Sequence, residues 1–234
     1  MSGDVRLIPI AGVDLRFTDA TWAFAEERRA DIDRHWEALL QTKPWLWNGR
    51  VLLTLEAVID DAAVLRATLA ETDFASFVAW RDWGWPDRGV RNTFGSPIIL
   101  SSDRALLYGR MGAGTANAGK VYPPGGSLEP GDVLPDGSVD VHGSIVRELA
   151  EETGLDAGHA RRGELLAVFD GQRLSIAQVL QFEEAAAELA ARAMRFIAAE
   201  EHPELEGVHV IRHSSDLDSE VPPYAVEIAR YLLR

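Results

Sequence analysis

The chain has 234 residues, of which 47% are hydrophobic and 26% are charged, and it contains no cysteine. This composition is sufficient for a folded core, and it excludes disulfides, zinc–thiolate centres and thiol nucleophiles. The formal net charge of −14 at pH 7 argues against a nucleic-acid polymer as a partner, because an acidic surface repels a phosphate backbone.

The N-terminal sequence MSGDVRLIPIAG has no long apolar core behind a basic start, so it does not predict a secretory signal. Nor does any stretch approach the roughly 18 uninterrupted apolar residues that a membrane helix needs. The absence of cysteine fits a reducing compartment. These features together predict a soluble cytoplasmic protein with no membrane partner.

The first 88 residues form a tryptophan-rich region that contains all seven tryptophans. Hydrophobic spacing and turn signals predict a strand, a long helix, a strand and a short helix closed by glycine, over 4–10, 19–41, 50–60 and 74–84. Residues 60–73 fit a strand by their alternation and a helix by their alanines. We predict a smaller α+β domain over 1–88, which caps the site of the following domain or builds a homodimer through its apolar surface.

Residues 89–234 alternate strands and helices around a long loop rich in glycine and proline. The pattern predicts a hairpin that turns at Ser102 and Asp103, a loop, a helix, two strands, a helix, a strand and a final helix, over 96–111, 112–138, 141–153, 163–170, 174–182, 183–201, 207–213 and 222–234. A loop of this length inside a compact domain is usually functional. The fold class is therefore predicted to be α/β, with a mixed β-sheet sandwiched between helices in a domain over 89–234.

The helix predicted over 141–153 carries three carboxylates on one face. At about 100° per residue, Glu148, Glu151 and Glu152 fall within one narrow arc near the C-terminal end of the helix. Their mutual repulsion and the helix dipole both disfavour this arrangement. A solvated acidic face is one interpretation. The other is a site for a hard divalent cation such as Mg²⁺, which prefers carboxylate oxygens.

The glycine pair Gly125-Gly126 lies in the loop that precedes this helix. Two glycines let the backbone turn tightly and bring a carbonyl or an amide close to an ion or a phosphate, although most such pairs are plain turns. The order of glycine pair, acidic loop and acidic helix favours the cation site over the solvated face.

The segment GGSLEPGD … RELAEETGL resembles the Nudix box, G-x5-E-x7-R-E-U-x-E-E-x-G-U with U aliphatic. The matching positions, in order, are Gly126, Arg147, Glu148, Leu149, Glu151, Glu152, Gly154 and Leu155. Two departures stand out. Asp132 takes the place of the first box glutamate, and the next spacer, 133–146, is about seven residues longer than in the family pattern. Which acid meets Arg147, Asp132 or Asp136, is left open.

The resemblance implies an enzyme that hydrolyses a pyrophosphate bond in a nucleoside diphosphate linked to another moiety. It implies that Mg²⁺ or Mn²⁺ neutralises the phosphates and lowers the pKa of bound water. The metal ligands that it implies are Glu148, Glu151, Glu152 and the carbonyl of Gly125. It gives catalytic roles to Glu151 and Glu152, makes Arg147 the residue that orients helix and loop, and makes Gly126 part of the substrate-binding loop.

A further acid outside the box serves in this family as a general base or an extra ligand. The acidic stretch AAEEHPELEG makes Glu201 and Glu204 the candidates, and surface solvation is the alternative for each. Arg91 is a candidate for binding substrate phosphate, with balance of the acidic surface as its alternative. The small-molecule partner is a nucleotide sugar, ADP-ribose, coenzyme A or a dinucleoside polyphosphate. A non-catalytic nucleotide sensor on the same scaffold is the competing hypothesis.

Overall fold

The computed structural model describes residues 5–234, and the chain divides into two compact units. The first unit contains 5–10, 94–126 and 142–234, and the second contains 11–93 and 127–141. The main division at 93/94 lies close to the residue 88 of the predicted domains. Each unit nevertheless includes a short segment, 5–10 or 127–141, from the other part of the sequence. Residue 4, the start of the first predicted strand, lies outside the described residues.

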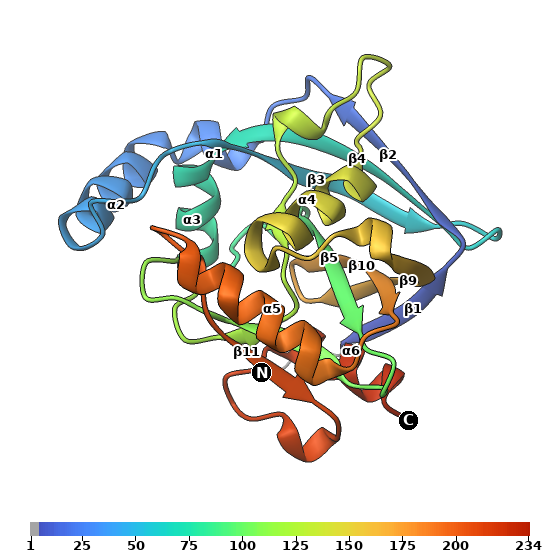
Figure 1. The fold of residues 1–234 in the computed structure, drawn as a ribbon. Coiled ribbons are helices and arrows are strands. Elements are labelled where there is room, and N and C mark those ends of the chain that lie inside the picture. Colours follow the sequence, from blue (N-terminus) through green and yellow to red (C-terminus); the bar gives the residue numbers. More distant parts are fainter. Residues whose placement is uncertain (1–4) are drawn as a thin grey trace. The chain divides into compact units, whose positions relative to one another are not determined.

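The first unit is built on a sheet (Figure 1). Its strands are β1 (Arg6–Ile10), β5 (Arg91–Leu100), β6 (Leu106–Met111), β7 (Val121–Tyr122), β8 (Gly126–Ser127), β9 (Ala160–Asp170), β10 (Arg173–Phe182) and β11 (Leu205–Ile211). Strands β1, β9, β10 and β5 are neighbours in that order, while β6 pairs with β5, β7 and β11. The pairs β1–β9, β9–β10 and β6–β11 are antiparallel. Strand β5 begins in the second unit and continues into the first.

Helices cover both faces of this sheet. They are α4 (Val141–Thr153), α5 (Ala186–Ala199) and α6 (Pro223–Leu232). Successive residues of a strand point to opposite faces, so Ile98 and Ile99 of β5 enter different cores. Ile98 packs with Ile228 of α6, and Ile99 belongs with Leu149 of α4 and Leu189 of α5. Figure 1 shows α5 running beside β11.

The second unit contains the mixed strand pairing. Its elements are β2 (Gly12–Thr18), α1 (Ala23–Glu27), α2 (Arg29–Thr42), β3 (Arg50–Ile59), β4 (Val64–Asp73) and α3 (Phe74–Asp82). Strand β4 is parallel to β2 and antiparallel to β3. Several aromatic side chains, among them Trp22, Phe77 and Trp80, pack into one buried cluster. Most tryptophans therefore serve the core, whereas Trp45 and Trp47 are exposed.

The α/β class with helices on both sides of a sheet is thus confirmed, with several local differences. The helix predicted over 19–41 is two helices, α1 and α2, that meet at Arg28. Residues 60–73, which fitted either type, form a turn and strand β4. Strand β2 was not predicted, nor were the two-residue strands β7 and β8 within the predicted loop 112–138. Three short 3-10 helices, Pro130–Asp132, Ala157–His159 and Ser214–Asp216, complete the elements, and no helix within residues 5–234 is long and apolar enough to cross a bilayer.

Candidate active site

Helix α4 spans the residues predicted for it, and its apolar side fixes its orientation. Ile145 and Leu149 are almost completely buried one turn apart on the helix, and Leu149 packs into the core that contains Ile99 of β5. Gly154 ends the helix with a φ of +64°, a conformation in which glycine avoids the Cβ strain of other residues. Packing of one face thus holds the last turn, which carries the acidic residues, against the first unit.

The glycine loop and the acidic helix meet through a direct hydrogen bond. The backbone N–H of Gly125 donates to Oε1 of Glu152 over 2.8 Å. The Glu152 residue is only 5% exposed, and its Oε2 is buried without a hydrogen-bond partner among the described residues. A buried carboxylate oxygen with no partner is costly to maintain, so it indicates a position where a cation or a donor is expected.

Burial raises the pKa of the Glu152 carboxyl well above its usual range. The hydrogen bond from Gly125 acts in the opposite direction, whereas the negative charges of Glu148, Glu204 and Glu151 raise the pKa further. Four carboxyl groups therefore share one electrostatic environment. A group of acids that repel one another in this way is the environment that a divalent cation relieves.

Gly126 brings a second carboxylate to the loop. A Cβ atom at this position would collide with the carboxyl group of Glu148, so only glycine allows that carboxylate to lie against the backbone. A Cβ on Gly125 would likewise collide with the carbonyl oxygen of Gly95 on β5. Gly125 therefore has no room for a Cβ beside the backbone of β5, and the glycine loop contacts both Glu148 and Glu152 of the helix.

The remaining predicted acids occupy different surroundings. Glu151 is exposed on α4, and Glu204 lies at the entry to β11 with its carboxyl pKa raised by burial and then by the charge of Glu151. The Glu204 side chain keeps much of its surface open to solvent, so its loss of hydration is partial. Glu201 is exposed and makes no hydrogen bond or ion pair within residues 5–234. The structure therefore joins Glu204, and not Glu201, to the acidic group.

The two predicted cationic residues lie in different units. Arg147 is half-buried on α4 in the first unit, one residue before Glu148. Arg91 is the first residue of β5 and belongs to the second unit, as does Asp132, which replaces the first box glutamate. Asp132 is buried at the end of the 3-10 helix Pro130–Asp132, where its Oδ2 accepts from the N–H of Glu129 over 3.0 Å.

The donor set suits a hard divalent cation, although the side chains do not form a finished cage. Within residues 5–234, no three histidine, aspartate or glutamate side chains are arranged so that they could hold an ion between them. Glu152 is anchored at the loop by its hydrogen bond and Glu148 lies against Gly126, whereas Glu151 is exposed, so its side chain can change rotamer on a fast timescale. The unpartnered Oε2 of Glu152 and the oxygen-only chemistry fit Mg²⁺ or Mn²⁺.

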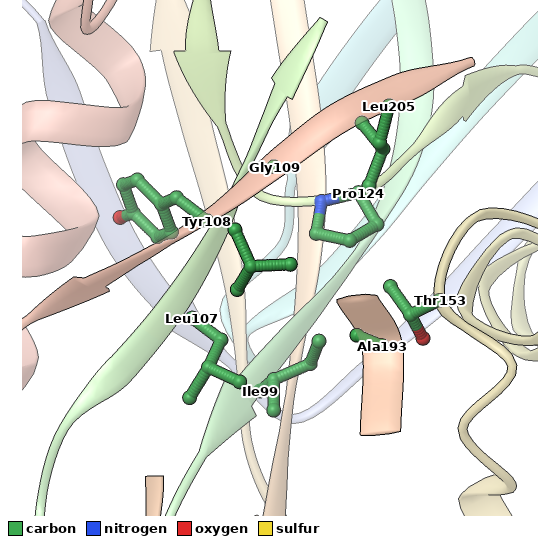
Figure 2. A pocket seen from close by; sticks show the side chains of 9 residues that line it. Ile99, Leu107, Tyr108, Gly109, Pro124, Thr153, Ala193 and Leu205 are labelled. Carbon is green, nitrogen blue, oxygen red and sulfur yellow. The ribbon is translucent and has the colours of Figure 1, made fainter. Parts of the chain in front are cut away.

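A small cavity beside this region is apolar and is not the substrate site. Figure 2 shows its walls, which come from β5, β6 and β11 together with Pro124, Thr153 and Ala193. Pro124 and Thr153 are the sequence neighbours of Gly125 and Glu152, so the cavity borders the loop–helix contact. No charged side chain lines it, which excludes it as a place for a polyanion.

Sequence reasoning missed Tyr122, which directly precedes the segment Pro123–Gly126. Its hydroxyl accepts a 3.0 Å hydrogen bond from Nδ2 of Asn117. Burial raises the pKa of the Tyr122 hydroxyl well above its usual range, and the charges of Glu152 and Glu204 add to the effect. Its place next to the glycine pair was the available signal, because the backbone there is held against the acidic helix.

Comparison with known proteins gives similar structures but no similar sequence. No protein-family model and no curated protein sequence matches the chain. A MutT protein from Methanosarcina mazei Go1 is 18% identical, with a TM-score of 0.40 over 61% of this chain and 92% of that one. A Nudix hydrolase from M. smegmatis, RenU, is 12% identical, with a TM-score of 0.40 over 61% and 83%.

A third similar structure is a bifunctional NMN adenylyltransferase/ADP ribose pyrophosphatase from Francisella tularensis, complexed with AMP and a Mn ion. It is 19% identical, with a TM-score of 0.42 over 67% of this chain and 45% of that one. The chain thus partly resembles solved structures that are described as a MutT protein, a Nudix hydrolase and a bifunctional ADP ribose pyrophosphatase. The sequence identities and the TM-scores of these likenesses are low.

Proposed function

We propose that this chain is a Nudix-type hydrolase, which cleaves a pyrophosphate bond in a nucleoside diphosphate linked to another moiety. The single observation that supports this most is the hydrogen bond between Gly125 and Glu152, because it joins the two halves of the motif in one site. The buried, unpartnered Oε2 of Glu152 supports the same proposal, since such an oxygen suits a cation ligand.

The proposed metal ligands are Glu148, Glu151, Glu152 and the carbonyl of Gly125. A divalent cation bound there supplies positive charge that neutralises phosphate oxygens and polarises the attacking water. The chain's own part is to hold the Glu152 carboxylate at the loop by a hydrogen bond, to place that of Glu148 against Gly126 and to offer a third from the exposed Glu151. Because burial raises the pKa of Glu152, this carboxyl must lose its proton before it can bind a cation.

Glu204 is the proposed general base, and Glu201 is set aside as the weaker candidate. Burial and the charge of Glu151 raise the pKa of Glu204, which makes it a better proton acceptor than an ordinary surface carboxylate. Arg147 is proposed to orient α4 and the glycine loop. Gly126 is proposed to form part of the substrate-binding loop, and a phosphate contact of Arg91 stays a prediction from the sequence.

The experiment is a turnover assay with Mg²⁺ and with Mn²⁺ on ADP-ribose, nucleotide sugars, coenzyme A and dinucleoside polyphosphates. ADP-ribose comes first, because one similar structure is described as an ADP ribose pyrophosphatase. Glu152→Gln should lose at least about a hundredfold in turnover, the scale of removing one strong transition-state interaction. The matched control is Glu188→Gln on the exposed side of α5, which should keep wild-type turnover.

Two results would contradict the proposal. One is the absence of turnover of every compound with both metals, and the other is full activity in Glu152→Gln. Binding of one of these compounds without any turnover would favour the nucleotide sensor instead.

A further inference from the structure

The small apolar cavity of Figure 2 lies where three segments of the site converge. Its wall includes one residue from the glycine loop, one from the end of α4 and one from the start of β11, which are Pro124, Thr153 and Leu205. These are the direct chain neighbours of Gly125, Glu152 and Glu204. The packing around this cavity therefore relates the position of Glu204 to that of Glu152.

Leu205 is fixed on the cavity side of this junction. It is almost completely buried, and it lies opposite Met111 in the pairing of β11 with β6. A Cβ at Gly109 would be 2.6 Å from Cδ2 of Leu205, so the leucine side chain fills the space that the glycine leaves open. Leu205 also packs with Ile197 of α5. The residue directly after Glu204 is thus held by β6 and α5.

The backbone of Glu204 itself is held by Gly112. The Gly112 N–H donates to the carbonyl oxygen of Glu204 over 2.7 Å. Gly112 is buried, and a Cβ there would be 3.1 Å from the same oxygen and 3.5 Å from the carbonyl oxygen of Pro203. The φ of Gly112 is not positive, so the close approach to the chain before β11 is the reason for a glycine here.

The strand that follows Glu204 begins with an irregularity. The pairing of β11 with β6 shifts register directly after Leu205, so Glu206 is an extra residue in the ladder. Leu205 packs in the same cluster as Val208, although residues three apart in a regular strand point to opposite faces. Bulges of this kind re-aim side chains beside functional sites. The place of Glu204 therefore depends on the contacts of 203–205 and not on a regular strand.

We infer that Gly112 and Leu205 are positioning residues, which hold the carboxylate of Glu204 at a fixed place relative to the acidic end of α4. The inference rests on the proposed function, in which Glu204 is the general base. A general base works only within hydrogen-bond reach of the proton that it removes, directly or through one water. Because a shift of about 1 Å can cost about a hundredfold in rate, the backbone contact of Gly112 has a catalytic consequence.

Gly112→Ala is the direct test. Its Cβ would press on the Glu204 carbonyl oxygen at 3.1 Å, so the chain there must shift by a few tenths of an ångström. We expect kcat to fall by about threefold to tenfold, while KM and the Kd of Mn²⁺ change by less than about twofold, because the proposed metal ligands lie on other segments. Gly114→Ala is the matched control from the same loop, since a Cβ there meets nothing within 4 Å, and it should keep the wild-type kcat.

The Glu204→Gln background shows whether Gly112 acts through Glu204. Since Glu204→Gln removes the base, adding Gly112→Ala to it should lower kcat further by less than about twofold. Equal losses in the two backgrounds would overturn the inference, as would an unchanged kcat in Gly112→Ala.

Leu205 is tested in the same two backgrounds. Leu205→Ala enlarges the cavity, whereas Leu205→Met keeps most of the side-chain volume. We expect Leu205→Ala to lower kcat in the wild-type background and much less in Glu204→Gln, and Leu205→Met to keep most of the wild-type kcat. Thermal unfolding must show that each variant is folded, and Leu205→Val replaces the alanine variant if that one unfolds. Equal losses in both backgrounds would exclude Leu205 as a positioning residue.

A measurement without turnover separates this inference from the proposed function. The ¹³C signal of the Glu204 carboxyl, assigned by its loss in Glu204→Gln, should move in Gly112→Ala and keep its wild-type position in Gly114→Ala. An unmoved signal in Gly112→Ala would overturn the positioning role. If the signal moves but no compound is hydrolysed with either metal, the proposed function is contradicted and the positioning of the Glu204 carboxylate is supported.

Discussion

Gly125 and Glu152 are 27 residues apart in sequence and are joined by a 2.8 Å hydrogen bond from backbone N–H to carboxylate. The bond uses one carboxylate oxygen and leaves the other buried. A side chain held in this way has little rotational freedom, so its second oxygen has a defined position. The glycine loop therefore fixes the position of the second carboxylate oxygen of Glu152.

Glu152→Gln should separate the charge of this residue from its hydrogen bond. The amide oxygen of glutamine can still accept from Gly125, while the buried negative charge disappears. Without metal, we expect the variant to be at least as thermally stable as the wild type. Mn²⁺ at about a hundred times its Kd should stabilise the wild type by about 2.7 kcal/mol, and the variant by much less.

Thermal unfolding with and without Mn²⁺ measures both effects. Glu188→Gln, an exposed charge removal on α5, should respond to Mn²⁺ as the wild type does. Equal stabilisation of wild type and Glu152→Gln by Mn²⁺ would count against Glu152 as a ligand.

The raised pKa of Glu152 predicts a pH dependence with a definite sign. Between the ordinary carboxyl pKa of 4.5 and the raised folded value, the folded protein binds more protons than the unfolded chain. The metal-free protein should therefore lose stability as pH rises through this window. Over the same window the affinity for Mn²⁺ should increase, because the cation and the proton compete for the same oxygen.

Chemical denaturation and calorimetry from pH 5 to pH 8 provide these two measurements. Glu152→Gln should flatten the stability slope, since it has no proton to lose. A wild-type stability that rises steadily with pH across this range would show that Glu152 is ionised in the metal-free fold.

Gly126→Ala tests the close approach of Glu148 to the loop. The added Cβ would occupy the position of the Glu148 carboxyl group and displace it. We expect weaker Mn²⁺ binding and at least about a tenfold loss of turnover, because misplacement of a catalytic group by about 1 Å is sufficient for such losses. Gly114→Ala is the matched control, since a Cβ there meets nothing within 4 Å. Similar activity in the two variants would show that the contact between Gly126 and Glu148 is not needed.

Gly154→Ala tests the end of the acidic helix. Alanine at a φ of +64° is strained by about 1–2 kcal/mol, and its Cβ would lie 2.5 Å from the Phe196 ring. Gly137 has a similar φ of +79°, and a Cβ there meets nothing within 4 Å. Gly137→Ala therefore measures the backbone strain alone. Urea denaturation should show that the free energy of unfolding falls by about 1–3 kcal/mol more in Gly154→Ala than in Gly137→Ala, because of the clash with Phe196. Equal losses would mean that Phe196 moves aside freely.

Local signals predicted the elements that contain their own start and stop residues. The helix 141–153 was predicted with the bounds that α4 has, because Gly154 stops it and its apolar arc is clear. The turn at Ser102 and Asp103 was predicted for similar reasons. Residues 60–73 were ambiguous because alanine has little preference for strands. The parallel pairing with β2 and the antiparallel pairing with β3 decide their structure, and such long-range partners are not visible in one sequence.

The sequence motif predicted the part of the site that its own residues form. The meeting of the glycine pair with the acidic helix followed from the resemblance, and the structure has both contacts. The packing of Tyr122 against Tyr224 of α6 joins two residues that are far apart in the chain. The position of Tyr122 close to the glycine pair is visible in the sequence, but its contact with Tyr224 is not, because only the folded chain brings the two rings together.

The chain leaves the first unit after Gly126 and returns to it at His142, and the residues between these points belong to the second unit. The extra residues of the box lie almost entirely within this excursion. One end of the segment 127–141 is held by the hydrogen bond of the Gly125 amide, and the other end is held by the packed face of α4. A change in the length of the excursion therefore alters closure entropy by only a few tenths of a kcal/mol and leaves the two anchoring points in register. The number of residues between Gly126 and α4 is for that reason a poor guide to whether the glycine loop meets the helix. The fold preserves the positions of the two ends of the segment.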